Sequence, residues 1–133
     1  MGRFALSVVA AYVAFAVLFT VAMMVVYPDT MALFADLMRG EDDPMMMWAY
    51  AGHLVQTVVL VWLFDRGFAT NDLKKGAMFG GAFGLYVAAT TFTMYMSFKW
   101  PVGGHMHVQM ITDVAIFVIV GVILALLYKP KAA

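Results

Sequence analysis

The residues best suited to chemistry in this sequence are polar side chains that stand inside apolar segments. His105, Gln109 and Asp113 recur at every fourth position near the start of the last apolar run, so in a helix they share one face. A carboxylate two helical turns inside a hydrophobic segment is costly, and such residues commonly mark solute paths, proton relays or ligand sites. This stripe is therefore the centre of the candidate site.

Other polar residues are predicted at a similar depth in the neighbouring apolar runs. His53 and Asp113 each follow the outer start of their run by two turns of helix, which places both about 12 Å down their helices. We therefore predict an intramembrane polar layer, in which His53 and Asp113 form a pair. The members of this layer are His53, Gln56, Thr91, Gln109 and Asp113, with Thr20 at the same level.

A second set of residues could supply soft metal ligands. Thioether and imidazole ligands favour Cu(I) over harder ions, and nearly all of the 13 methionines fall in the predicted outer half. The candidate copper ligands are His105, His107, Met106, Met110, Met94 and Met96. Methionine also fills apolar cores without a metal. Two histidine positions separated by one residue lie about 200° apart around a helix, so a joint site requires a non-helical start to the last run.

Several other chemistries find no support. The absence of cysteine excludes disulfides and thiolate sites, and a formal net charge of zero provides no basic patch for nucleic acid. Axial haem ligation would need His53 and a second histidine at one depth, but the depths differ by roughly 9–12 Å. No nucleophile is paired with a base, and no phosphate loop or zinc motif is present. We therefore expect a protein that is not an enzyme and holds no cofactor, with copper as the alternative.

Four apolar runs must position these residues. The 133-residue chain is 65% hydrophobic and 12% charged, whereas soluble proteins are about half apolar and about a quarter charged. The runs cover approximately residues 4–27, 45–64, 76–98 and 105–128, and each has the ~20 residues that are needed to cross a bilayer. Short connections predict an all-α, antiparallel four-helix bundle that forms a single transmembrane domain over residues 1–133. A short amphipathic helix at about residues 30–39 is expected at the membrane interface between the first two spans.

Local signals suggest where these helices begin and how they pack. Asp43 as N-cap, with Pro44 in the first helical position, predicts the start of the second span. The polar residues 65–75 are expected to separate the second span from the third. Small residues then repeat at every fourth position of the third span and allow a second helix to approach closely. This small-residue stripe consists of Gly76, Gly80, Gly84 and Ala88.

The distribution of positive charge predicts the orientation in the membrane. Arg39 and Lys99 are the only basic residues in the connections on one side, whereas the other six Lys and Arg lie on the side that holds both termini. Because basic residues collect on the cytoplasmic side, we expect both termini in the cytoplasm of a bacterium and the spans in its inner membrane. Membrane lipids, other membrane subunits or further copies of the chain are the expected partners.

Four short motifs also carry a resemblance. A first span ends in Tyr27-Pro28 before an amphipathic Phe-Ala-Asp-Leu segment, and Ala-Gly-His-Leu surrounds His53. The glycine-rich third span ends at Trp100-Pro101, and Asp113 lies early in the fourth. In these features the chain resembles a group of small bacterial four-span membrane proteins known only as domains of unknown function. The resemblance implies the four-span fold and the membrane location, and it implies nothing about chemistry.

These observations favour a non-enzymatic accessory or scaffold subunit that contacts other membrane proteins or itself. One alternative is an outward-facing copper-binding protein that uses the methionine and histidine ligands. A second alternative is a proton or small-solute path through Asp113 and His53, for which an intramembrane carboxylate is suited.

Overall fold

The computed structural model describes residues 2–40, 42–99 and 105–128, and within these ranges the chain is helical and contains no strand. Side chains at positions 30, 31 and 105 are outside this description. The five α-helices are α1 (Gly2–Val21), α2 (Pro28–Phe34), α3 (Met46–Leu63), α4 (Leu73–Ser97) and α5 (His105–Leu127). A π-helical segment extends α1 over Ala22–Val26 and another extends α3 over Phe64–Phe68, while a 3₁₀ turn over Ala35–Leu37 follows α2.

Four of these helices are long and apolar enough to cross a membrane. They cover Gly2–Val26, Met46–Phe68, Leu73–Ser97 and Met106–Leu127. In the most apolar stretch of each, only 22–33% of the residues are buried inside the protein. Most apolar side chains therefore face outward, as is expected where lipid replaces water around a helix. This arrangement is compatible with a multi-pass membrane protein.

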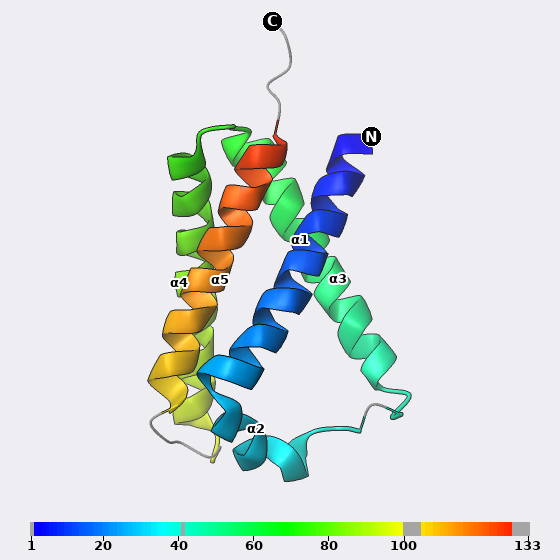
Figure 1. Cartoon of the computed structure of the whole chain (residues 1–133), viewed down its shortest axis with the longest axis vertical. Helices are drawn as coiled ribbons and strands as arrows, with labels where there is room; N and C mark the ends of the chain where they lie inside the picture. The colour runs from blue at the N-terminus through cyan, green and yellow to red at the C-terminus, as the bar shows by residue number, and fades with distance from the viewer. Residues whose placement is uncertain (1, 41, 100–104, 129–133) are drawn as a thin grey trace, which may run out of the picture.

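Successive spans run in opposite directions (Figure 1). The start of α1 and the end of α5 lie at one end of the molecule, which we call the terminal end, and α2 lies at the other, which we call the α2 end (Figure 1). Both ends of the described chain are therefore on the same side of the four helices, as an even number of spans requires.

The closest packing joins α4 to α5 along the small-residue stripe. A Cβ added to Gly76 would lie 2.5 Å from the carbonyl oxygen of Gly121, and one added to Gly84 would lie 2.7 Å from Cα of Val114. Ala88 continues the stripe and is also buried. The two backbones thus touch directly, which is the approach that small residues permit between membrane helices.

The other two spans are arranged around this pair. Helix α1 packs against both α5 and α3. Phe15 of α1 is central to this contact, with its ring centroid 4.8 Å from that of Phe117 on α5. In Figure 1, α3 diverges from the α4–α5 pair towards the α2 end, where its first turns stand well apart from them. The four helices therefore form an arrangement that is open on one side, whereas the sequence had predicted a four-helix bundle without indicating an opening.

The aromatic core lies towards the terminal end. The ring of Phe64 meets the ring of Phe79 at 5.2 Å and that of Tyr128 at 6.3 Å. Phe68 in turn meets Phe79 at 4.9 Å. The π-helical turn after α3 carries Phe64 and Phe68 to this position, so the second helical span reaches four residues beyond its expected end at position 64. Ala69 ends it in the left-handed conformation, with φ 41°.

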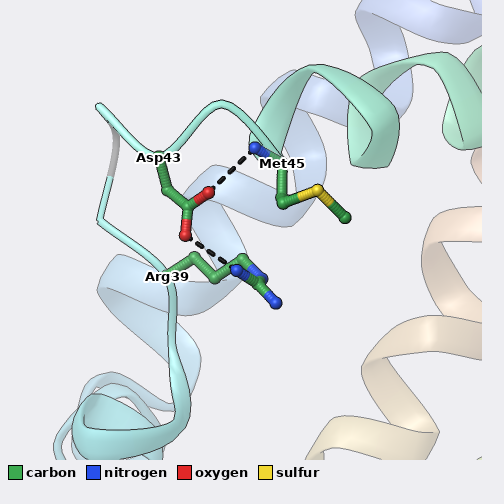
Figure 2. Close-up of polar contacts among 3 residues, drawn as sticks. All are labelled: Arg39, Asp43 and Met45. Atoms are coloured by element: carbon green, nitrogen blue, oxygen red, sulfur yellow. Dashed lines mark hydrogen bonds and ion pairs between the residues drawn. The ribbon is translucent and has the colours of Figure 1, made fainter.

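The predicted cap of the second span is wrong. Helix α3 begins at Met46 with Met45 as N-cap, two positions after the expected start at Pro44. Asp43 instead closes the preceding turn, because its Oδ1 accepts from the Met45 amide at 2.8 Å and its Oδ2 accepts from Arg39 at 2.8 Å (Figure 2). The same carboxylate therefore joins the segment after α2 to the start of α3.

The third span begins earlier than predicted. Asp72 is the N-cap of α4, and its Oδ1 accepts from the backbone amides of Lys74 at 2.9 Å and Lys75 at 3.4 Å. These bonds satisfy amides that have no partner within the helix. The helix therefore starts at Leu73 and includes both lysines in its first turn, three residues before the expected start at Gly76.

The helix between the first two spans is also shifted. Pro28 occupies the first turn of α2, where its lack of a backbone N–H costs no hydrogen bond within the helix. Helical structure then runs to Leu37, so the segment covers residues 28–37 where 30–39 was expected. Its apolar residues Phe34 and Leu37 border a cavity against the spans. This helix therefore covers part of the α2 end of the protein.

Candidate functional site

The structure divides the predicted polar layer between two cavities. Thr20, His53 and Gln56 line a groove between α1 and α3. Thr91 and Gln109 line a second cavity beneath α2. The predicted layer is thus two separate groups of polar side chains, because α3 leans away from the α4–α5 pair.

The first cavity is the larger, with a volume of about 930 Å³, and we call it the α1–α3 groove. His53 is half-buried in its wall, with its ring 5.1 Å from Tyr12 and 5.6 Å from Phe15. Buried Thr57 donates its hydroxyl to the backbone carbonyl of His53 at 2.9 Å. Aromatic side chains form much of the wall, and the lining includes no Asp, Glu, Lys or Arg. The aromatic lining residues are Tyr12, Phe15, Phe19, Tyr50, Phe83, Tyr86 and Phe117.

The second cavity, which we call the α2-end cavity, has a volume of about 580 Å³. Tyr95 donates its hydroxyl to Oε1 of Gln109 at 3.1 Å, joining α4 to α5 across it. The ring of Phe34 meets that of Tyr95 edge-on at 6.3 Å. The walls of the α2-end cavity combine aromatic rings, thioethers and a few uncharged polar groups. The lining residues are Met23, Tyr27, Phe34, Leu37, Met38, Thr90, Thr91, Met94, Tyr95 and Gln109.

Asp113 is buried, with 4% of its surface exposed, and its Oδ1 has no hydrogen-bond partner. The expected pair with His53 is not formed: neither an ion pair nor a hydrogen bond joins these two described residues. The physical reason is that Phe15 of α1 lies between α3 and α5, where it contacts both His53 and Phe117.

The candidate copper ligands whose side chains are described differ in burial and in the surfaces they border. Met106 is buried, whereas His107 and Met96 are exposed. Met94 borders the α2-end cavity, while Met110 is half-buried on α5. The structure begins α5 at His105, so positions 105 and 107 lie on a helix about 200° apart. The non-helical start that a joint histidine site requires is therefore not present.

Among the described residues, no group of three or more His, Asp or Glu could hold a metal ion. The side chain of His105 lies outside those residues, as do Trp100 and Pro101, on which part of the resemblance rests.

The sequence analysis missed two buried tyrosines that line the α2-end cavity. Tyr27 is buried although it directly precedes Pro28, and Tyr95 is buried near the end of α4. A signal for Tyr95 was available, because Thr91 follows Ala88 by three residues and Tyr95 follows Thr91 by four, which keeps both on roughly the helix face of the small-residue stripe. No comparable signal identifies Tyr27, whose position depends on the turn between α1 and α2.

Comparison with known proteins indicates no function, so the function is argued from the geometry of the site. Neither the family models nor the curated proteins nor the solved structures provide a match to this chain.

Proposed function

We propose that this protein is a non-enzymatic accessory or scaffold protein of the bacterial inner membrane, and that its α1–α3 groove receives a transmembrane helix of another membrane protein. The observation that carries the proposal is the groove itself. About 930 Å³ is left unfilled by the chain, bordered mainly by α1 and α3 and also by residues of α4 and α5, on the side where α3 diverges from α4 and α5 (Figure 1).

The chemistry of the groove favours a helix over a lipid chain. Thr20, His53 and Gln56 line it at mid-span, and an acyl chain offers these groups no hydrogen bond. A phosphate headgroup would find no Lys or Arg among the lining residues. A partner helix with Ser, Thr, Asn or Gln can satisfy such groups, since interhelical hydrogen bonds and close packing are what join helices in membranes.

The exposed surface of α3 supports the same proposal. Val55 and Val59 border the groove and are exposed to 62% and 48%. In a bilayer these side chains meet either lipid or another protein, and the hydrophobic effect does not distinguish the two. The neighbouring polar residue Gln56 then supplies the specificity for a protein partner.

The orientation follows from the charges. With both termini in the cytoplasm, as the positive-inside rule favours, the α2 end, towards which α3 diverges from the α4–α5 pair, faces the periplasmic side of the membrane. A partner helix would therefore be held mainly in its periplasmic half.

Site-specific photo-crosslinking in native membranes tests the proposal. A benzophenone amino acid is placed at Thr20 or at Val59, which lie on the two walls of the groove. The control position is Leu85, which is 66% exposed on α4 and does not border the groove. We expect both groove positions, and not the control, to cross-link the same protein, with the linked peptide inside one of its transmembrane segments.

A groove-filling variant makes the test specific. Ala16 borders the groove, so Ala16→Trp should abolish the cross-link, whereas Ala82→Trp on an exposed face of α4 should leave it unchanged. Cross-links only to lipid would refute a protein partner. Cross-links only to a second copy of the chain would replace the partner protein with a homo-oligomer.

A further inference from the structure

We infer that the α2-end cavity binds an uncharged ring compound of the quinone class, and that the amide nitrogen of Gln109 donates to one of its carbonyl oxygens. The cavity is separate from the α1–α3 groove, so this site stands independently of the proposed function. Within about 580 Å³ it combines apolar walls with polar groups that can hold a ligand.

Two polar side chains of the cavity are available to such a ligand. Oε1 of Gln109 accepts from Tyr95 at 3.1 Å, whereas no hydrogen bond within the described residues uses the Gln109 amide nitrogen. The Thr91 hydroxyl also has no partner in the described part of the chain, although the neighbouring Thr90 donates to the carbonyl of Tyr86 at 3.0 Å. Gln109 and Thr91 are both half-buried and line the cavity. The cavity therefore offers its occupant one amide donor and one hydroxyl.

The lining favours a ligand without charge. The described residues that border the cavity include no Asp, Glu, Lys, Arg or His. A charged ligand would lose its water there without gaining a counter-charge, which is costly in an apolar environment. A neutral molecule with a hydrogen-bond acceptor avoids this cost and still engages the amide donor.

The walls favour a flat ring over a lipid chain. Aromatic rings prefer edge-to-face or offset contact with other rings, and thioethers make favourable contacts with ring edges. Six lining residues supply these two kinds of surface: Met23, Tyr27, Phe34, Met38, Met94 and Tyr95. A saturated acyl chain could occupy the same space, but it would leave the Gln109 amide and the Thr91 hydroxyl without partners.

One wall of the cavity is built by an irregular backbone segment. The π-helical turn Ala22–Val26 ends where the amide of Tyr27 donates to the carbonyl of Ala22 at 3.1 Å. This turn and the residue after it contribute Met23 and Tyr27 to the lining. Because π-helical turns occur frequently at functional sites, the backbone supports a ligand site by a feature separate from the lining chemistry.

A quinone ring matches these features together. Its carbonyl oxygens accept hydrogen bonds without carrying a charge, and its flat ring suits the aromatic and thioether walls. The cavity volume lies within the range of sites for small organic molecules. Quinones also dissolve in the bilayer, from which a cavity between spans can be reached.

Two ligands with the same fused ring test the inference. Menadione carries two carbonyl groups that 2-methylnaphthalene lacks, and the chain has no cysteine with which menadione could react. Each is titrated into the full chain in phosphatidylcholine nanodiscs, with empty nanodiscs to subtract partition into lipid. We expect saturable binding of menadione, tighter than that of 2-methylnaphthalene by about two- to tenfold, as one uncharged hydrogen bond contributes.

Gln109→Leu should remove this preference, so that the two ligands bind the variant equally. A merely structural effect of the substitution would instead weaken both ligands by the same factor and preserve the preference for menadione. Equal affinities in the wild type, no saturable binding of menadione, or a preserved preference in Gln109→Leu would each overturn the inference.

A second pair of variants locates the site even if Gln109→Leu does not fold. Met38→Trp fills the cavity and should abolish menadione binding. Met24→Trp, at a 72% exposed position outside the cavity, should bind menadione as the wild type does. Wild-type binding by Met38→Trp, or equal losses in the two variants, would contradict a site in this cavity.

Discussion

Gly80→Ala should destabilise the contact between α4 and α5 far more than its small size suggests. The added Cβ would meet the carbonyl oxygen of Phe117, with the carbonyl carbon of Phe117 at 2.7 Å and Cα of Val118 at 2.9 Å. All three atoms belong to the backbone of α5, so a side-chain rotation cannot relieve the clash. The helices must move apart, or the substitution must remain strained.

The magnitude can be isolated with a neighbouring glycine. A Cβ at Gly81 would meet only Cγ2 of Val118 at 3.6 Å, which is ordinary contact. Both substitutions gain the same helix propensity, so the difference between their unfolding free energies measures the packing cost at position 80. Overpacking of a tight core costs about 1–3 kcal/mol. This cost lowers the equilibrium constant for folding by about 5- to 150-fold.

The assay is reversible unfolding in mixed micelles, followed by energy transfer between dyes on α4 and α5 and by circular dichroism. Gly81→Ala should be neutral or slightly stabilising, and Gly80→Ala should lower the unfolding free energy relative to it by the amount above. If the two variants unfolded at the same denaturant concentration, the close backbone contact would be absent and the reasoning would be refuted.

Two further predictions concern single polar contacts. In a double-mutant cycle, Tyr95→Phe and Gln109→Leu should show a coupling free energy of about 0.6 kcal/mol, and at most about 1.7 kcal/mol, as interhelical hydrogen bonds in membranes do. Strictly additive effects of the two substitutions on the unfolding free energy would contradict the 3.1 Å hydrogen bond between these side chains. The Met45 amide and the Arg39 guanidinium lower the pKa of Asp43 from its usual range. Their stabilisation of the turn before α3 should therefore be complete above the usual aspartate pKa and lost as pH falls through the lowered value. The NMR shift of the Met45 amide should report this midpoint, which Arg39→Gln should raise; a midpoint in the usual aspartate range would contradict the contact.

The number and approximate position of the spans could be predicted from the sequence, because hydrophobicity over about 20 residues is a local property. The small-residue stripe could be predicted for a similar reason, since residues four apart share a helix face wherever the helix lies. The structure places this stripe against α5, with Gly121 of α5 opposite Gly76. The sequence did not identify α5 as the partner helix.

The helix ends were predicted less accurately, because competing local signals stand close together. Asp43 and Asp72 both precede apolar segments, but only Asp72 accepts from the amides of a helix start. Asp43 is held by Arg39, four residues before it, and by the Met45 amide. The preference for one arrangement over the other depends on how the chain enters α3 from α2.

The candidate site shows most clearly what sequence alone determined. The residue types and their depth along each helix followed from position in the chain, and so did the apolar surroundings that make Asp113 unusual. Whether His53 reaches Asp113 depended on the tilt of α3 and on Phe15, which lies between the two helices. Such tilts result from the sum of many weak packing contacts between distant segments. For that reason only the tertiary structure could separate His53 from Asp113 and leave the buried Oδ1 of Asp113 without a hydrogen-bond partner.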